Sequence, residues 1–208
     1  MLCLQNQWIH IDGDSLARDV FYDMNEIFGL GWNDKHKTLE NLSQGGGATG
    51  NSSERPLITF SSDTIKFRDT PNWYPLLQGV KRGCPDVWIY SSGLWDHPKN
   101  TSDAKYYKRT KALANFSASF SDCEIKHKIL RYTTPYQLPS RLMLNERAKR
   151  YNEIATELLV PVGFQYVDTF EMLSSRPDLS HDGVHYTGPG SKWVTNSILN
   201  LICPSSSS

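Results

Sequence analysis

The chain has 208 residues, of which 38% are hydrophobic, and its formal net charge is +0. This length suits one domain with a sizeable core, and the balanced charge gives no electrostatic basis for binding nucleic acid or an anionic membrane surface. No apolar run is long enough to span a bilayer. We therefore expect a single domain over residues 1–203 and a disordered Ser-rich tail at 204–208.

The first expected elements are a strand at residues 8–12, which ends at Gly13, and a helix that begins near Ser15. The helix is indicated by apolar residues that recur every four positions, namely Leu16, Val20 and Met24. Ser15 thus lies where a strand passes into a helix, at the carboxyl edge of a sheet and near the partial positive charge of a helix start. A plain N-cap serine would give the same pattern.

Strands and helices alternate along the rest of the chain. Strands are expected at 57–67, 86–90, 125–132 and 164–168, helices at 103–120, 141–159 and 191–200, and a short helix or turn at 73–80. This alternation predicts an α/β fold with a parallel sheet covered by helices on both faces. Residues 33–56 are glycine-rich and lack an apolar period, so we expect a flexible surface insertion there rather than a phosphate loop.

A second motif, at residues 182–185, lies on the loop between the last strand and the last helix. Asp182 stands three residues before His185, so its carboxylate can reach Nδ1 of the imidazole and leave Nε2 free for Ser15. Acyl transfer needs a serine hydroxyl activated by an imidazole, with a carboxylate that fixes the tautomer. The order Ser, Asp, His differs from the orders in chymotrypsin and subtilisin. Alone, the motif would also fit a surface turn with a solvated histidine.

Three short segments, at residues 13–18, 91–96 and 182–185, together carry a family resemblance. They match Gly-Asp-Ser-x-x-Arg, a central strand-end motif and Asp-x-x-His, and the chain thereby resembles the SGNH/GDSL hydrolase superfamily. More narrowly it looks like the PC-esterase branch, which includes the trichome birefringence-like polysaccharide O-acetyltransferases. The resemblance implies a three-layer α/β/α sandwich, flavodoxin-like, with a central parallel sheet. It also implies catalysis without a metal ion or cofactor, and no His/Cys/Asp/Glu cluster has metal-ligand spacing.

By this resemblance Ser15 is the nucleophile, His185 is the general base and Asp182 orients the imidazole. The Ser15 backbone N–H would donate to the oxyanion. The chain departs from the usual Gly-x-Asn-Asp segment, because Trp95 stands where the oxyanion-binding asparagine would be. Arg18, one helical turn beyond the serine, is a candidate substitute, and an ordinary surface cation is the alternative. Further residues expected to bind the oxyanion or the substrate are Asp14, Gly93, Asp96 and Tyr186.

The four cysteines form no Cys-x-x-Cys pair, which argues against a zinc or thioredoxin-like site. Three pairings are possible, and we prefer Cys3–Cys203 with Cys84–Cys123 because each pair flanks elements that a parallel sheet can bring close. Four free buried thiols are the alternative. The pairing remains open at the level of sequence.

Four glycosylation sequons begin at Asn41, Asn51, Asn100 and Asn115. With paired cysteines they favour a glycoprotein in the secretory lumen or outside the cell, and the cytoplasm is the alternative. The chain begins without a recognisable signal peptide, so attachment to a membrane would require an anchor absent from this chain.

The sequence therefore predicts a serine esterase or O-acyltransferase that works through an acyl-enzyme on Ser15. By resemblance, its partner is a carbohydrate or small ester, with O-acetyl esters of glycans as the expected substrate. One alternative is a catalytically weak or inactive domain of the same fold that binds glycan or protein. Another is a cytosolic hydrolase of small esters or lipids.

Overall fold

The computed structural model describes residues 2–29, 56–62, 84–91, 93–97, 99–119, 124–137 and 144–204. The expected insertion at 33–56, apart from Pro56, and the expected element at 73–80 lie outside these ranges. The same holds for the Ser-rich tail beyond Pro204.

The centre of the fold is a parallel sheet. Its described strands run in the order β2 (Leu57–Ser62), β1 (Trp8–Gly13), β3 (Val87–Ser91), β4 (His127–Arg131) and β5 (Phe164–Val167). The chain passes from β1 to β2 on one side and then returns to place β3 on the other side of β1. This reversal makes the carboxyl ends of β1 and β3 the switch point where ligands bind in open α/β sheets.

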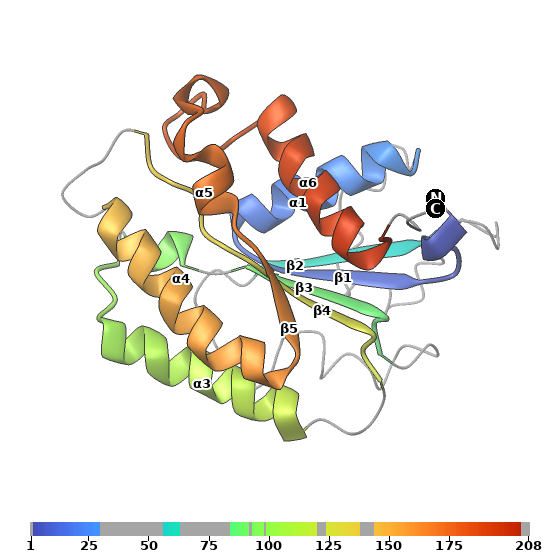
Figure 1. Ribbon diagram of the computed structural model, residues 1–208, viewed down its shortest axis with the longest axis horizontal. Helices are drawn as coiled ribbons and strands as arrows, with labels where there is room; N and C mark the ends of the chain where they lie inside the picture. Colours follow the sequence, from blue (N-terminus) through green and yellow to red (C-terminus); the bar gives the residue numbers. More distant parts are fainter. Residues whose placement is uncertain are drawn as a thin grey trace.

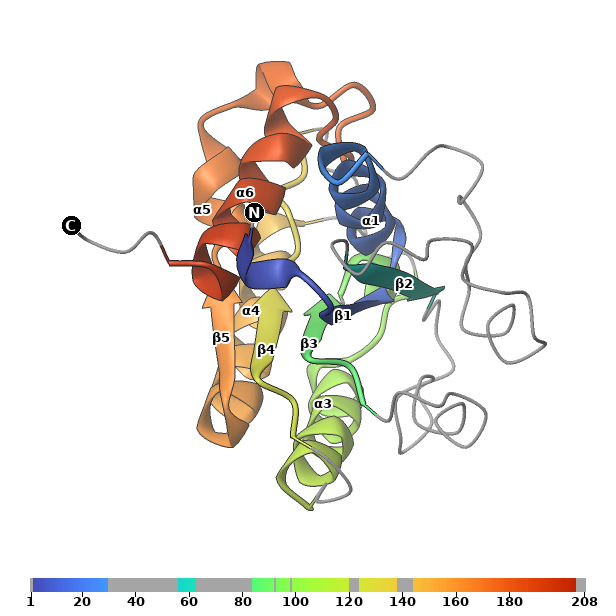
Figure 2. The ribbon, with the colours of Figure 1, turned by 90° about the vertical axis from the view of Figure 1, so that its right-hand side faces the viewer.

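Helices cover both faces of the sheet (Figures 1 and 2). One face carries α1 (Ser15–Ile27), α5 (Thr169–Ser174) and α6 (Pro189–Ile202), and the other carries α3 (Asp103–Ser119) and α4 (Asn145–Leu159). Short 3₁₀ turns are η1 (Leu2–Leu4), η4 (Leu94–Asp96), η5 (Val160–Val162) and η6 (Pro177–Leu179). The expected three-layer α/β/α sandwich is confirmed. In the described parts of the chain, none of the helices has the length and apolar character needed to cross a membrane.

Some element boundaries differ from the expected ones. The last helix begins at Pro189, two residues early, because proline's fixed φ suits a first helical turn whose N–H groups have no partner within the helix. The helix expected from 141 begins at Asn145. The short helix α5 was not expected, and it begins where the Asp168 carboxylate accepts the N–H of Glu171.

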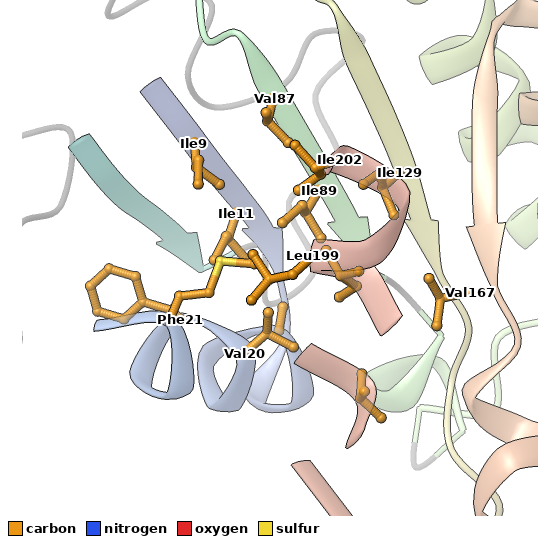
Figure 3. Packing of buried hydrophobic residues seen from close by; sticks show 14 of the residues in the cluster. Ile9, Ile11, Val20, Phe21, Val87, Ile89, Ile129, Val167, Leu199 and Ile202 are labelled. Atoms are coloured by element: carbon orange, nitrogen blue, oxygen red, sulfur yellow. The ribbon is translucent and has the colours of Figure 1, made fainter. Parts of the chain in front are cut away.

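The two sheet faces bury different side chains. Ile9, Ile11, Val87 and Ile89 point toward α1 and α6, where they pack with Phe21 and Leu199, among others (Figure 3). The opposite face buries a second cluster that includes Trp8, Trp88, Leu113 and Leu159 against α3 and α4. Both β1 and β3 are buried on both faces, and β3 is a nearly continuous apolar run, as is usual for parallel strands. β1 also buries His10 and Asp12, which hydrogen-bond to side chains of β2.

A disulfide joins the two ends of the domain. Cys3, in η1, and Cys203, at the end of α6, are bonded with a Cα–Cα distance of 5.9 Å across 200 residues of sequence. The preferred Cys3–Cys203 pairing is therefore confirmed. The other expected bridge involves Cys123, which lies outside the described residues, and it stays a prediction.

We expect Cys203→Ser to lower the free energy of unfolding by about 2–5 kcal/mol, because the bridge closes a long loop and restricts the unfolded chain. Urea unfolding without reductant measures the change. The double variant Cys3→Ser/Cys203→Ser should lose no more than the single variant. An unchanged urea midpoint in either variant would contradict the account.

Candidate active site

The strand–helix junction that presents Ser15 depends on Gly13. The backbone of Gly13 has φ +152°, and a Cβ at this position would lie 2.3 Å from the Ser91 carbonyl oxygen. Only glycine allows β1 to pass so close to β3 before the chain turns into α1. Asp14 then caps the helix, since its Oδ1 accepts the N–H of Leu16 at 3.0 Å. Ser15 is the first residue of α1, with a half-buried side chain.

The structure brings the expected Ser–His–Asp residues together. Ser15 Oγ lies 2.7 Å from His185 Nε2, and His185 Nδ1 lies 2.6 Å from Asp182 Oδ2. With Nδ1–H donating to the carboxylate, Nε2 is left as the acceptor that faces the serine hydroxyl. This is the hydrogen-bond arrangement of a nucleophile, a base and an orienting acid.

Asp182 is held as an anion by its own loop. Its Oδ1 accepts the backbone N–H groups of Val184 at 2.9 Å and His185 at 2.7 Å. Partial burial raises the pKa of Asp182, but these hydrogen bonds and the one from the His185 ring outweigh it and lower the pKa to about 2. A second imidazole stands nearby, with His181 Nε2 at 3.8 Å from Asp182 Oδ2.

The segment after β3 contains three of the expected binding residues, two of which are buried and one exposed. Gly93 is buried, and its φ of +110° requires glycine. Trp95 is 42% exposed on η4, so its indole is available to a ligand. Asp96 is buried in an ion pair with Arg109 Nη2 at 2.5 Å, so its carboxylate already has a partner within the protein, and its expected role in binding substrate stays a prediction.

Tyr186 also differs from expectation. Its ring is 3% exposed within the core under α6, and its hydroxyl hydrogen-bonds to the Pro135 carbonyl and the Gln137 amide. The core thus already engages both the ring and the hydroxyl of Tyr186, and the expectation that it binds substrate stays a prediction. Arg18, by contrast, is exposed on α1, one turn beyond Ser15.

A buried charge cluster that the sequence analysis missed lies beneath the serine. Arg131 ends β4 in register with Ser91, which is itself paired with Gly13, and it is 3% exposed. Its guanidinium donates to the Tyr132 carbonyl at 3.0 Å. The available signal was a charged residue directly after the apolar pair Ile129 and Leu130.

Two acids near the start of α1, Asp14 and Asp19, interact electrostatically with this cation. Burial raises the pKa of Asp14, and the charge of Arg131 and nearby backbone N–H groups, including that of Leu94, oppose the rise. Burial also raises the pKa of Asp19, and the positive charge of Arg131 is among the contributions that oppose this rise. The site thus holds a buried cation and two further carboxylates around the Ser15 and His185 pair. Among the described residues, no group of three or more His, Cys, Asp or Glu is arranged to hold a metal ion.

Several solved structures, described as hydrolases or esterases, are similar to this chain in fold. An α/β hydrolase from the metagenome of Lake Arreo, Spain, has a TM-score of 0.63 and 18% identity, over 99% of this chain and 100% of its own. An acetylxylan esterase from Geobacillus stearothermophilus has a TM-score of 0.61 and 14% identity, over 99% and 98%.

A lipase/acylhydrolase from Enterococcus faecalis has a TM-score of 0.56 and 14% identity, over 95% of each chain. No protein-family model matches the sequence, and no curated protein matches it. At these identities the likeness shows the fold alone, a parallel sheet between two layers of helices, as the sequence predicted.

The lowered pKa of Asp182 predicts how its ionisation and its contribution to stability change with pH. A carboxyl whose pKa falls on folding stabilises the folded state above its unfolded value of about 3.9, and this contribution is lost as the pH falls through about 2. Asp182 should therefore stay ionised at pH 4, and any loss of activity above that pH must come from another group.

Carbon-13 NMR of the Asp182 carboxyl should show an inflection well below pH 3, and an inflection near pH 4 or higher would contradict the account. In His185→Ala, which loses the ring hydrogen bond, the inflection should move upward.

Proposed function

We propose that this protein is a serine esterase that forms an acyl-enzyme on Ser15. The observation that carries the proposal is the hydrogen-bonded series from Ser15 Oγ through His185 to Asp182, with distances of 2.7 and 2.6 Å. Its place at the carboxyl ends of β1 and β3, where such sheets bind ligands, supports the same conclusion.

In the proposed reaction, Ser15 Oγ attacks the ester carbonyl carbon while its proton passes to His185 Nε2. The imidazolium so formed is stabilised by the ionised Asp182 at Nδ1. As the tetrahedral intermediate collapses, the C–O bond of the ester breaks and His185 gives the proton to the leaving alkoxide. Water, or the hydroxyl of an acceptor, then attacks the carbonyl carbon of the acyl-serine and passes its proton to His185. The bond between the acyl carbon and Ser15 Oγ breaks, the acid or new ester leaves, and His185 returns the proton to Ser15 Oγ.

The oxyanion needs donors that are in place before the reaction. The backbone N–H of Ser15 is one, because it lies at the start of α1, where N–H groups have no partner within the helix. We propose Arg18, exposed one turn further on, as a second donor. This assignment replaces the asparagine of related hydrolases, whose position Trp95 occupies.

We propose carbohydrate O-acetyl esters as the substrates, with transfer to water or to a hydroxyl. The exposed indole of Trp95, close in sequence to the end of β3, offers a face on which a sugar ring can stack. The similarity of the fold to an acetylxylan esterase supports this substrate class. The PC-esterase branch and O-acyltransferase activity belong to the same proposal.

The Cys3–Cys203 bridge favours an oxidising compartment over the cytoplasm, and with it a substrate outside the cell or in the secretory lumen. Two of the four sequons fall on described residues, and both Asn100 and Asn115 are exposed. Glycosylation at these positions is part of the proposal. A reduced, cytosolic hydrolase of small esters or lipids fits the bridge less well.

A second candidate function is a binding domain of the same fold. The residue that favours a binding domain is Trp95, because it stands where the resemblance expects the oxyanion-binding asparagine. Loss of one oxyanion donor typically lowers the rate about 10²–10³-fold. The intact Ser15, His185 and Asp182 geometry favours the enzyme.

Kinetics of variants with a short acetate ester test the enzyme. Ser15→Ala and His185→Ala should each lower kcat on the order of 10⁴-fold or more, and the double variant should lose little beyond either one, since the residues act as a unit. Asp182→Asn should be the milder change, because the imidazole remains while its tautomer is no longer fixed. If Ser15→Ala hydrolysed the ester as fast as the wild type, the binding-domain function would replace this one.

Substitution of Trp95 tests the substrate class. With an acetylated oligosaccharide, Trp95→Ala should raise KM about 2- to 10-fold through lost stacking, whereas KM for an aryl acetate should change little. Trp193→Ala is the matched control, because Trp193 on α6 is equally exposed, at 41%. Equal effects of both variants on both substrates would contradict a sugar-binding role for Trp95.

A further inference from the structure

The loop that carries His185 has little regular structure of its own. Between η6 and α6, its only described strand-like contact is a single antiparallel bridge between Ser180 and Tyr186. Asp182 binds atoms of this same loop, so it shapes the loop without fixing it against the rest of the molecule. Another element must therefore hold His185 at 2.7 Å from Ser15.

Residues 133–137, here called the bridging segment, contact the loop on both sides of His185. The Gln137 N–H donates to the Gly183 carbonyl at 2.8 Å, and Thr134 Oγ1 donates to the Val184 carbonyl at 3.2 Å. Beyond His185, the Tyr186 hydroxyl donates to the Pro135 carbonyl at 3.2 Å. The position of His185 thus depends on the position of the bridging segment.

The bridging segment is itself irregular, and two asparagines of α4 satisfy its backbone. Asn152 Oδ1 accepts the Thr133 N–H at 3.0 Å, and its Nδ2 donates to the Thr133 carbonyl at 3.4 Å. Asn145 makes the same reciprocal pair with Tyr136, at 2.7 and 3.1 Å. The asparagines are seven residues apart, so both lie on one face of the helix, two turns from each other.

An apolar cluster ties the same parts together. Leu16, next to the nucleophile, packs with Tyr136 of the bridging segment and Ala148 of α4. Val184 of residues 180–188, here called the catalytic loop because it carries His185, packs against this group. Leu16 and Val184 adjoin Ser15 and His185 in sequence. Both halves of the proposed catalytic pair therefore rest on one cluster that includes α4 and the bridging segment.

We propose that Asn145 and Asn152 are positioning residues for His185, acting from α4 through the bridging segment. The inference rests on the proposed esterase function. Asparagine suits the role because one amide can accept from an N–H and donate to a C=O of the same residue, whereas aspartate can only accept and leucine can do neither. Neither side chain needs to touch the substrate.

The test compares Asn152→Asp with Thr134→Val, and Glu153→Ala is the control on the exposed face of α4. Asn152→Asp removes one donor, and Thr134→Val removes only the hydroxyl that reaches the catalytic loop. Each should lower kcat with a short acetate ester about 10- to 100-fold while KM changes less than about threefold, because a small displacement of a catalytic base is costly. Glu153→Ala should leave both constants unchanged.

A second readout follows His185 without using activity. The Nδ1 proton of His185, hydrogen-bonded to Asp182, should give a sharp NMR signal in the wild type and a broadened or absent signal in Asn152→Asp and Thr134→Val. Unchanged kcat and an unchanged signal in both folded variants would overturn the proposal, even if their thermal stability fell.

Failure of the esterase function is distinguishable from failure of this inference. If the esterase function is wrong, Ser15→Ala should keep full activity. The NMR signal of His185 would still report whether α4 and the bridging segment hold the imidazole. Thr134→Val nearly conserves side-chain shape, so it keeps the test decisive if Asn152→Asp does not fold.

Discussion

The hydrogen bond between Ser15 Oγ and His185 Nε2 joins positions 170 residues apart, and the functional account depends on it. Local sequence cannot produce this contact. It requires β1 and β3 to lie side by side, so that Ser15 emerges at the carboxyl edge of the sheet, and it requires the last loop to return over that edge. This arrangement requires glycine at position 13, because any Cβ there would collide with the Ser91 carbonyl oxygen.

The buried charge of Arg131, beneath the site, is a second constraint on the structure around Ser15. A buried guanidinium such as that of Arg131 loses several kcal/mol of hydration and is tolerated only with counter-charges. Burial lowers the pKa of Arg131, and the acids Asp14 and Asp19, on either side of Ser15 in the sequence, oppose that lowering. Asp14 also caps α1, so this electrostatic interaction joins the end of β4 to the start of α1, where the proposed nucleophile lies.

Much of the fold could be predicted from local signals. The strands at 86–90 and 164–168 and the helix from 103 follow from apolar runs and helical periodicity, and the structure places them within one or two residues. The proposed triad residues were found because each belongs to a short motif beside a strand or helix end. The Cys3–Cys203 pair followed from its place at the two ends of the domain.

The remaining features depend on contacts between distant segments, which a single sequence does not display. Asp96 and Tyr186 adjoin motifs, yet tertiary partners occupy them, an arginine of α3 in one case and the core in the other. Asn145 and Asn152 look like ordinary polar helix residues, and only the fold shows that they hold the backbone beside the catalytic loop. Whether a side chain near a motif is already engaged within the protein depends on its burial and its hydrogen-bond partners. Both come from the tertiary structure and are not visible in one sequence.

Reaction of the purified protein with a fluorophosphonate, followed by mapping of the labelled peptide, tests the central claim most directly. Such reagents phosphonylate serines that a neighbouring base activates, so the account predicts a single label on Ser15 that is lost in His185→Ala. Absence of label on Ser15 in the folded wild-type protein would contradict the account.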